Sequence, residues 1–372
     1  MKKMRILFIS NNDAGLYKFR RELLETLTKE HEVYYCTSSG EYVERINAIG
    51  CKHIECTLLD RHGKNPLKDM SLIRFYKKVL RDIKPDIVFT FTIKPNCYAG
   101  MACASLHIPY VANITGLGTA VENKSLFQPI AKRLYQKGIK SAQKVFFQNS
   151  ENYKFMAQNG MIHDRYDIIP GSGVNLKQFE ESPYPKDTVI RFVFVGRIMR
   201  EKGIDQYLDA AKAIKAKHPN TEFHICGSYE QQYKDTVERL HGENVIIYHG
   251  SVGNMVEIYR MVSCTIHPSF YPEGMSNVLL ESCACGRPII TTDRPGCREI
   301  VDDGVNGFVV KQRDSADLIE KVERFLSLRP EEREKMGMLA RKKVEREFDR
   351  QIIVDKYIQE LESVGKKQCA ER

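Results

Sequence analysis

Two glutamates stand eight positions apart in Glu273-Gly-Met-Ser-Asn-Val-Leu-Leu-Glu281, where a short apolar strand gives way to a helix. The helix is predicted to run from about Ser276 to Cys285, after a loop over residues 269–274. Since eight residues are a little over two helical turns, Glu281 lies on nearly the same face as the residues before Ser276. We therefore expect both carboxylates to reach one ligand, beside free N–H groups that can bind an anion. The alternative for an isolated pair is a capped surface helix with two solvated acids.

A basic pair lies upstream, where another strand leaves the predicted sheet. Residues 190–196 form a continuous apolar strand that ends at Gly196 and is followed by Arg197 and Lys202. Open parallel sheets bind ligands at the carboxyl ends of their strands. A guanidinium can bind two oxygens and an ammonium acts as a point charge, so the pair is suited to a diphosphate. Two solvated basic residues in a turn are the alternative.

The elements that must position these residues alternate regularly between strand and helix. Short apolar strands are typical of a parallel sheet covered on both faces. The predicted strands are 5–10, 32–37, 53–56, 86–91, 110–114 and 144–148, then 191–196, 222–226, 245–248, 264–267, 288–291 and 307–309. The predicted helices include 17–30, 40–49, 72–83, 96–106, 125–142, 152–159 and a terminal amphipathic helix at 348–363. The polar, proline-containing segment 180–187 separates the two halves.

Together these residues resemble the donor-site signature of retaining nucleotide-sugar glycosyltransferases of the GT-B fold, glycosyltransferase family 4. In the second half, residues 168–179, 249–269 and 296–307 resemble further family segments, with Asn175 where aspartate is usual. In the first half, Tyr17–Arg20, Thr92–Asn96 and Asn113–Gly118 resemble the branch that builds bacterial lipid-linked oligosaccharides for capsule, O-antigen or protein glycosylation.

The resemblance implies a fold, a set of domain boundaries and a reaction. The fold is α/β, with two doubly wound Rossmann-like domains facing across a cleft and a C-terminal helix that crosses back to the first domain. The expected domains are an acceptor-binding domain at 1–180, a nucleotide-sugar domain at 188–346, and the returning helix and tail at 347–372. The implied enzyme moves a hexose or N-acetylhexosamine, with retention, from a UDP-sugar to an undecaprenyl-diphosphate-linked saccharide. Neither a cofactor nor a metal is expected.

Roles follow from the resemblance for individual residues. Arg197 and Lys202 would stabilise the departing diphosphate, Glu273 would contact the sugar and Glu281 the ribose. The remaining donor-binding residues are Gly15, Gly196, Gly227, Ser228, Ser251, Val252, Met275, Ser276, Asn277 and Val278. The acceptor-binding candidates are Tyr17, Arg20, Lys94, Asn96, Thr115 and Gly116.

Some of these candidates have simpler explanations. Thr115 and Gly116 stand where many family members have a donor-site histidine, and a plain tight turn is the alternative there. Arg20 is nearly as well explained as a solvated residue on a helix as by contact with a ligand. The same two explanations apply to Lys94 and Asn96.

The basic excess of the chain is confined to its first half. Residues 1–180 contain 27 Lys and Arg against 17 Asp and Glu, and the remainder contains 30 against 31. Much of the excess lies at 61–84 and 132–144. A one-sided cationic surface is attracted to an anionic leaflet by about 1 kcal/mol per residue. Nucleic acid is the rival partner, but no recognition module or aromatic platform accompanies the charge.

The remaining observations concern the location of the protein in the cell and the state of its cysteines. No stretch approaches the roughly 20 apolar residues of a spanning helix, and the apolar run near the N-terminus is too short for a signal peptide. We therefore expect a cytoplasmic protein, peripherally bound at the inner face of the plasma membrane. Eleven cysteines without a CxxC pair indicate reduced, buried thiols.

The two-domain pattern of strands and helices is also compatible with functions other than glycosyl transfer, of which one is disfavoured and two remain as alternatives. The absence of GxGxxG after the first strand of either half argues against a dinucleotide dehydrogenase. A nucleotide-sugar 2-epimerase of the same two-domain build is the alternative enzyme, and a non-catalytic scaffold is the alternative of another class.

Overall fold

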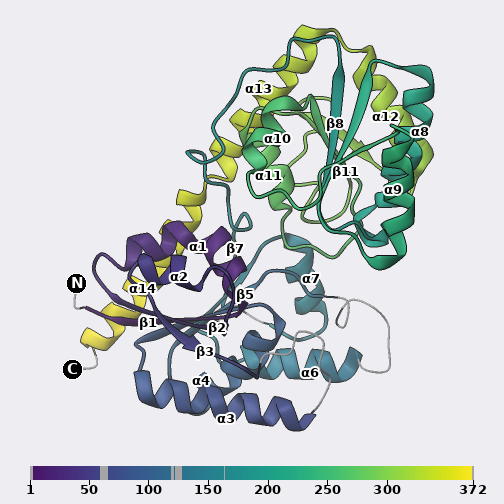
Figure 1. Cartoon of the computed structure of the whole chain (residues 1–372). Coiled ribbons are helices and arrows are strands. Elements are labelled where there is room, and N and C mark those ends of the chain that lie inside the picture. Colours follow the sequence, from purple (N-terminus) through teal and green to yellow (C-terminus); the bar gives the residue numbers. More distant parts are fainter. Residues whose placement is uncertain (1–2, 59–65, 119–120, 122–127, 163, 371–372) are drawn as a thin grey trace. The chain divides into compact units, whose positions relative to one another are not determined.

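The computed structural model describes residues 3–58, 66–118, 121, 128–162 and 164–370, and these form two compact units (Figure 1). Unit 1 comprises Met1–Ser172 with Arg350–Arg372, and unit 2 comprises Gly173–Asp349. The first boundary lies eight residues before the position expected from the sequence. The reason is local: the Val174 N–H donates to the Phe348 carbonyl at 2.9 Å, and the Phe179 ring packs against Tyr259. Residues 173–180 therefore belong to unit 2.

Unit 1 is built on a seven-stranded sheet in which every pairing is parallel, in the order β3-β2-β1-β4-β5-β6-β7. The chain order reverses between β1 and β4, so a topological switch point lies at the carboxyl ends of these two strands. The strands are β1 Arg5–Asn12, β2 Glu32–Ser38, β3 Lys52–Glu55, β4 Ile87–Phe91, β5 Tyr110–Ile114, β6 Lys144–Phe147 and β7 Tyr166–Ile168.

Helices cover both faces of this sheet. One apolar cluster packs α1 and α14 onto one face, and the other packs α3, α4, α6 and α7 onto the opposite face. The same arrangement is visible in Figure 1. The helices are α1 Asp13–Leu27, α2 Val43–Ala48, α3 Pro66–Ile83, the π-helix η1 Pro95–Ala99, α4 Gly100–Ser105, α6 Gln128–Ile139, α7 Ser150–Gln158 and α14 Arg350–Ala370.

The C-terminal helix α14 belongs to unit 1, as the sequence predicted. Arg350, at its start, donates to both carboxylate oxygens of Glu22 at 3.0 and 2.8 Å and to the Ser172 carbonyl. Further along, the Tyr357 hydroxyl donates to Asn113 Oδ1 in the middle of the sheet. Buried Ile353, Val354 and Leu361 complete the contact with the core. The returning helix thus fixes the position of β5.

Unit 2 has a six-stranded parallel sheet in the order β10-β9-β8-β11-β12-β13. Its switch point lies between β8 and β11. The strands are β8 Ile190–Val195, β9 Thr221–Cys226, β10 Ile247–Tyr248, β11 Cys264–His267, β12 Ile289–Thr292 and β13 Gly307–Val310. The helices are the 3₁₀ turns η2 Arg200–Lys202 and η3 Gln231–Tyr233, then α8 Ile204–Lys217, α9 Lys234–Gly242, α10 Met255–Met261, α11 Asn277–Ala284, α12 Ser315–Ser327 and α13 Pro330–Glu347.

A fully buried arginine fastens the first loop of unit 2 to its core. The Arg287 guanidinium donates to main-chain carbonyls of Tyr259, Ser182, Pro183 and Arg260, at distances from 2.7 to 3.0 Å. These carbonyls share the positive charge, so the arginine needs no carboxylate partner. The segment before β8 is thereby held against α10, α11 and β12.

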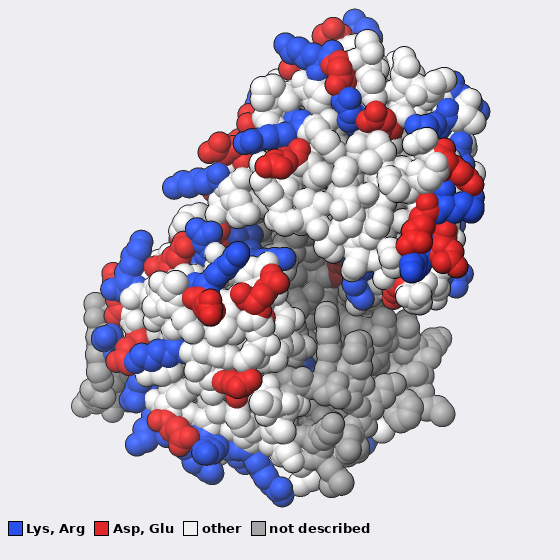
Figure 2. Space-filling view, in the orientation of Figure 1, with Lys and Arg blue, Asp and Glu red and all other residues white. Residues whose placement is uncertain are grey.

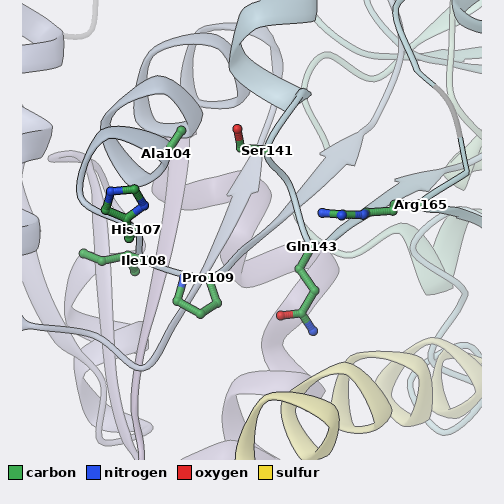
Figure 3. A pocket seen from close by; sticks show the side chains of 7 residues that line it. All are labelled: Ala104, His107, Ile108, Pro109, Ser141, Gln143 and Arg165. Carbon is green, nitrogen blue, oxygen red and sulfur yellow. The ribbon is translucent and has the colours of Figure 1, made fainter. Parts of the chain in front are cut away.

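An open pocket of about 560 Å³ lies at the amino ends of β5, β6 and β7. It is lined by Ala104, His107, Ile108, Pro109, Ser141, Gln143 and Arg165 (Figure 3). Parallel sheets bind their ligands at the opposite, carboxyl edge. This pocket therefore contains none of the ligand-binding residues predicted from the sequence.

Candidate functional site

The centre of the candidate site is an ion pair at the switch point of unit 2. β8 and β11 are neighbours in the sheet, so the loops that follow them begin side by side. Lys202 ends the turn after β8, Glu273 lies in the loop after β11, and the Lys202 ammonium contacts the Glu273 carboxylate. Their side chains are 15% and 12% exposed, respectively. The two chemical groups predicted from distant segments therefore meet in one place.

Glycine allows this close approach of the two loops. Gly203 has φ +77°, and a Cβ atom there would lie 2.1 Å from the Pro268 carbonyl oxygen. Real Cβ atoms do not come so close, so a larger residue would push the turn that carries Lys202 away from β11. The Phe270 N–H donates to the Glu201 carbonyl at 2.9 Å and holds the loops together.

A tyrosine that the sequence analysis did not select lies beside both predicted cations. The Arg197 guanidinium carbon is 5.6 Å from the centre of the Tyr271 ring, and the Lys202 ammonium is 5.1 Å from it. Such contacts stabilise a cation over the face of an aromatic ring. Arg197 itself is exposed and Tyr271 is half-buried. The Tyr271 ring is thus a shared contact of the two predicted cations.

The Glu273 carboxylate is held ionised although it is nearly buried. Burial alone would raise the pKa of Glu273, but the Lys202 ammonium and the His267 imidazole hold that pKa well below its usual range. His267 Nε2 lies 3.5 Å from Glu273 Oε1, and Ser269 Oγ lies 3.4 Å from the same oxygen. Neither ring nitrogen of His267 has a hydrogen bond of good geometry within the described part of the chain. Cys297 lies close by and is also fully buried.

The start of α11 is arranged so that it can receive an anion. The Ser276 N–H donates to the Gly296 carbonyl at 2.8 Å, and the Gly296 N–H donates to Glu299 at 2.7 Å. Ser276 is the N-cap residue, yet its hydroxyl does not cap the helix. That hydroxyl is buried and has no hydrogen-bond partner among the residues that the structure describes. A phosphate oxygen would supply the missing partner, because helix N-termini attract anions.

Glu281, about one turn into α11, is oriented by a buried tyrosine. The Tyr259 hydroxyl donates to Glu281 Oε2 and to the Val278 carbonyl, both at 3.3 Å. The Glu281 side chain is half-buried, and an ionised carboxylate acts only as a hydrogen-bond acceptor. Met275, Asn277 and Val278 line the same helix start, as predicted from the sequence.

Loops after β8, β9 and β10 converge beside this helix. The Gly227 N–H donates to the Gly250 carbonyl at 2.7 Å, and a Cβ atom at Gly227 would lie 1.9 Å from the Gly196 carbonyl oxygen. Ser228 and Ser251 are exposed on these loops, and Val252 is half-buried. The donor-binding candidates of unit 2 therefore all lie on loops or helix starts that follow β8, β9, β10 and β11.

The predicted residues of unit 1 divide into two groups. Tyr17, Lys94, Thr115 and Gly116 are half-buried near the carboxyl ends of β1, β4 and β5, at the edge where a ligand is expected. Gly15, in the first turn of α1, donates its N–H to Asn12 Oδ1 at 2.7 Å. These residues remain candidates for ligand contact.

Arg20 and Asn96 are corrections to the sequence analysis, because both are buried. Arg20 is 4% exposed, with its guanidinium carbon 5.1 Å from the Phe91 ring centre and 5.7 Å from that of Tyr357. Asn96 is fully buried; it accepts from Thr90 Oγ at 2.7 Å and donates to the Asn113 carbonyl at 2.8 Å. Arg20 is thus neither solvated nor presented to a ligand, and Asn96 joins β4 to β5.

Comparison with known proteins agrees with this geometry. The model of the family "Glycosyl transferases group 1" matches residues 176–343, and that of "Glycosyl transferase 4-like" matches residues 5–149. The chain is 25% identical over 98% of its length to N,N'-diacetylbacillosaminyl-diphospho-undecaprenol alpha-1,3-N-acetylgalactosaminyltransferase from Campylobacter jejuni, all of which is covered. The protein is a family 4 glycosyltransferase of the GT-B fold.

Solved structures show the same fold along the entire chain. A glycosyltransferase from Rickettsia africae superposes with a TM-score of 0.81 at 18% identity, covering 98% of this chain and 100% of that one. HepE from Anabaena, solved in complex with UDP, superposes with a TM-score of 0.78 at 16% identity, covering 97% and 100%. At these identities the structural likeness concerns the fold alone.

Three residues of the glycosyltransferase site escaped the sequence analysis. His267, Tyr271 and Cys297 all lie next to Glu273 or Lys202. His267 is the last residue of β11, and its position two residues before Ser269 could have drawn attention to it. Cys297 belongs to the family-like segment 296–307, but only the folding of the loop after β12 brings it to the site. No helix in the described residues is both long and apolar enough to cross a bilayer.

The buried ion pair makes a testable prediction about pH and stability. Lys202→Met leaves the Glu273 carboxylate without its counter-charge, and breaking a buried pair in this way costs about 3–5 kcal/mol. In the wild type the lowered pKa of Glu273 contributes stability above about pH 4.5, and this contribution is lost as the pH falls further. In the variant the pKa of Glu273 should instead rise, so protonation should restore stability as the pH falls. Urea unfolding at pH 8 and pH 5 should show the larger loss at pH 8.

The double variant Lys202→Met/Glu273→Gln is the matched control, because it carries neither charge. It should be more stable at pH 8 than Lys202→Met alone. A loss of stability that is the same at both pH values in Lys202→Met would show that the two charges do not interact in solution.

Proposed function

We propose that the protein transfers a hexose or N-acetylhexosamine from a UDP-sugar, with retention, to an undecaprenyl-diphosphate-linked saccharide. The observation that carries the proposal is the convergence of Lys202, Glu273 and the N-terminus of α11 at the switch point of unit 2, with Arg197 nearby over the Tyr271 ring. The name of the Campylobacter relative supports the acceptor and the sugar class, and the UDP complex of HepE supports the nucleotide. The pathway would be the assembly of a bacterial surface glycan.

The chemistry needs positive charge where the sugar–phosphate bond breaks. In the proposed mechanism Arg197 and Lys202 stabilise the negative charge that develops on the departing diphosphate, and the N–H groups at the start of α11 add to this effect. Glu273 holds Lys202 in place before the donor arrives, and it binds the hydroxyls of the transferred sugar. Glu281 accepts hydrogen bonds from the ribose. The departing phosphate takes the proton of the acceptor hydroxyl, so the reaction needs neither a protein nucleophile nor a divalent metal.

Unit 1 is proposed to receive the acceptor. Tyr17, Lys94, Thr115 and Gly116 are half-buried near its carboxyl edge and are the proposed contacts for a glycan or a diphosphate. Arg20 and Asn96 are left out of this set because they are buried. A lipid-linked acceptor lies in a membrane, so the same unit should also contact the membrane.

The surface charge of unit 1 supports such contact. Figure 2 shows Lys and Arg side chains gathered over α3, along the lower edge of the molecule in Figure 1. Arg74, Lys78 and Arg81 are exposed on this helix, and Lys77 is half-buried. Residues 128–148, which include α6, contain five Lys and Arg and no acidic residue. Lys64, at the start of the predicted basic stretch, lies outside the described residues.

Apolar side chains accompany these charges. Met70 on α3 is 54% exposed, and Ile130 on α6 is 58% exposed. Both helices pack against α4 on the same face of the sheet. A cationic face with a few protruding apolar side chains is suited to an anionic membrane surface. We therefore propose peripheral association with the inner face of the plasma membrane.

The proposed function is tested by incubating a panel of UDP-sugars with the protein, with and without a polyprenyl-diphosphate-linked saccharide. We expect UDP release and glycan extension only when the acceptor is present. A change of sugar configuration without any acceptor would identify the rival, a nucleotide-sugar 2-epimerase. Donor binding without either reaction would favour a scaffold. The same panel, repeated with GDP-sugars, tests the choice of nucleotide.

Measurements of kcat and KM should distinguish the roles of the residues in the proposed donor site. Arg197→Ala should lower kcat by about 10²–10³-fold, the usual effect of losing one group that stabilises transition-state charge. Glu281→Ala should raise KM for the donor more than it lowers kcat, because ribose contacts exist both before and during the reaction. Lys212→Ala, which removes an exposed charge from α8, serves as the control. Normal turnover in Arg197→Ala would remove this residue from the diphosphate site.

Membrane association should depend on the charge of α3. Changing Lys77, Lys78 and Arg81 to Glu should release the protein from anionic vesicles in co-sedimentation, while donor binding stays intact. Wild-type association should weaken in 1 M salt, where the screening length falls to about 3 Å. Changing the exposed Lys212, Lys335 and Lys342 of unit 2 to Glu alters the net charge equally and should have little effect. Sedimentation unaffected by salt and by the α3 changes would refute electrostatic docking.

A further inference from the structure

Behind the proposed diphosphate cations lies a group of three side chains with the chemistry of metal ligands. His267, Glu273 and Cys297 each offer one ligand atom, and these nitrogen, oxygen and sulfur atoms all lie within 4.8 Å of one another. His267 and Cys297 are fully buried, and Glu273 is reached by solvent on one side only. The three come from the end of β11, the loop after it and the loop after β12. Of the three, the mechanism proposed above uses Glu273 alone and gives His267 and Cys297 no role.

The spacing of these atoms is close to that of a tetrahedral site. Two ligands about 2.1 Å from one zinc ion, at a tetrahedral angle, are about 3.4 Å apart. His267 Nε2 and Glu273 Oε1 are 3.5 Å apart. The Cys297 sulfur lies within 4.8 Å of both atoms, so the side chains must draw closer before the three atoms share an ion.

The His267 imidazole provides a second observation, which is independent of the spacing of the three ligand atoms. His267 is completely buried, but neither of its ring nitrogens makes a hydrogen bond of good geometry in the described part of the chain. Nε2 lies 3.5 Å from Glu273 Oε1, which is a long distance for a direct N–H···O bond. Buried polar groups normally have partners, and one without a partner calls for an explanation. A bound cation between the nitrogen and the carboxylate would satisfy both groups.

We propose that His267, Glu273 and Cys297 bind a thiophilic divalent cation, with Zn²⁺ as the best match, and that this binding inhibits the enzyme. The mixed nitrogen, sulfur and oxygen donor set favours zinc over magnesium or calcium, which prefer oxygen ligands. On binding, the Cys297 thiol loses its proton to solvent and a sulfur–zinc bond forms. The Lys202 ammonium leaves the Glu273 carboxylate, because the cation takes its place. No electron is transferred.

Inhibition follows from the displacement of Lys202. The inference rests on the proposed function in one respect, namely that Lys202 and Glu273 serve the transfer reaction. With zinc bound, the ammonium no longer occupies its position beside Tyr271, and the carboxylate no longer faces the sugar. The fourth position of the ion remains open to solvent. The site is thus inhibitory, and it is compatible with a reaction that uses no metal.

Cobalt binding tests the site without any need for activity. The full-length protein, treated with chelator, is titrated with Co²⁺, which substitutes for zinc and gives a near-ultraviolet absorption band when a thiolate binds it. The wild type should give this band, and Cys297→Ser and Cys297→Ala should lose it. Cys264→Ser, which changes an equally buried cysteine on β11, should retain it. A band that persists in both Cys297 variants, or that is absent in the wild type, overturns the proposal.

Zinc inhibition provides the second arm of the experiment. Zn²⁺ should inhibit glycosyl transfer by the wild type, whereas Mg²⁺ at the same concentration should not. Half-inhibition of Cys297→Ser should need at least about tenfold more Zn²⁺, since one of three ligands is lost. Cys264→Ser should behave as the wild type. If no transfer is found with any donor, the cobalt band still decides the metal site, so failure of the proposed function and failure of this inference are distinguishable. Equal sensitivity of all variants to zinc would show that inhibition arises elsewhere.

Discussion

The ion pair between Lys202 and Glu273 is the interaction on which the rest of the donor site depends. It exists because β8 and β11 are neighbours at the point where the strand order reverses. Gly203 is required there, since any side chain would collide with the Pro268 carbonyl. The pair keeps a nearly buried carboxylate ionised and fixes the ammonium beside the Tyr271 ring. A diphosphate that enters this site meets cations that are already in position, which is how a protein stabilises developing charge without reorganisation.

Much of this arrangement could be predicted from the sequence, because periodic patterns and strand ends are local features. All six predicted strands of unit 2 are present, and α11 begins within one residue of its predicted start. The predictions from the sequence failed where contacts between distant segments decide whether a residue is buried. Arg20 lies in an ordinary amphipathic helix, and the packing of Phe91 and of Tyr357, which come from distant parts of the chain, makes it buried. The short edge strand β7 was missed because three residues give too little pattern.

The two units use the same sheet architecture in different ways. In unit 2, polar and charged groups at the switch point remain partly open to solvent. In unit 1, α14 closes over one face, and its Tyr357 hydroxyl bonds to Asn113, whose carbonyl accepts from Asn96. Several polar residues near the end of β4 and in β5 thus form hydrogen bonds inside the protein. Lys94 and Thr115 are half-buried. This difference explains why Arg20 and Asn96, two motif residues of unit 1, are buried in its core.

The proposed reaction uses no metal, yet the proposed site for a metal lies in the same place. A lysine can neutralise a carboxylate only by approaching it closely, and that requires a pocket in which few other groups compete. In this protein the far side of the pocket is formed by an imidazole and a thiol rather than by apolar side chains. As long as the ammonium remains, a cation at the trio is opposed by its charge. The ammonium is therefore both the proposed contact of the donor diphosphate and the occupant that keeps the carboxylate from serving as a metal ligand.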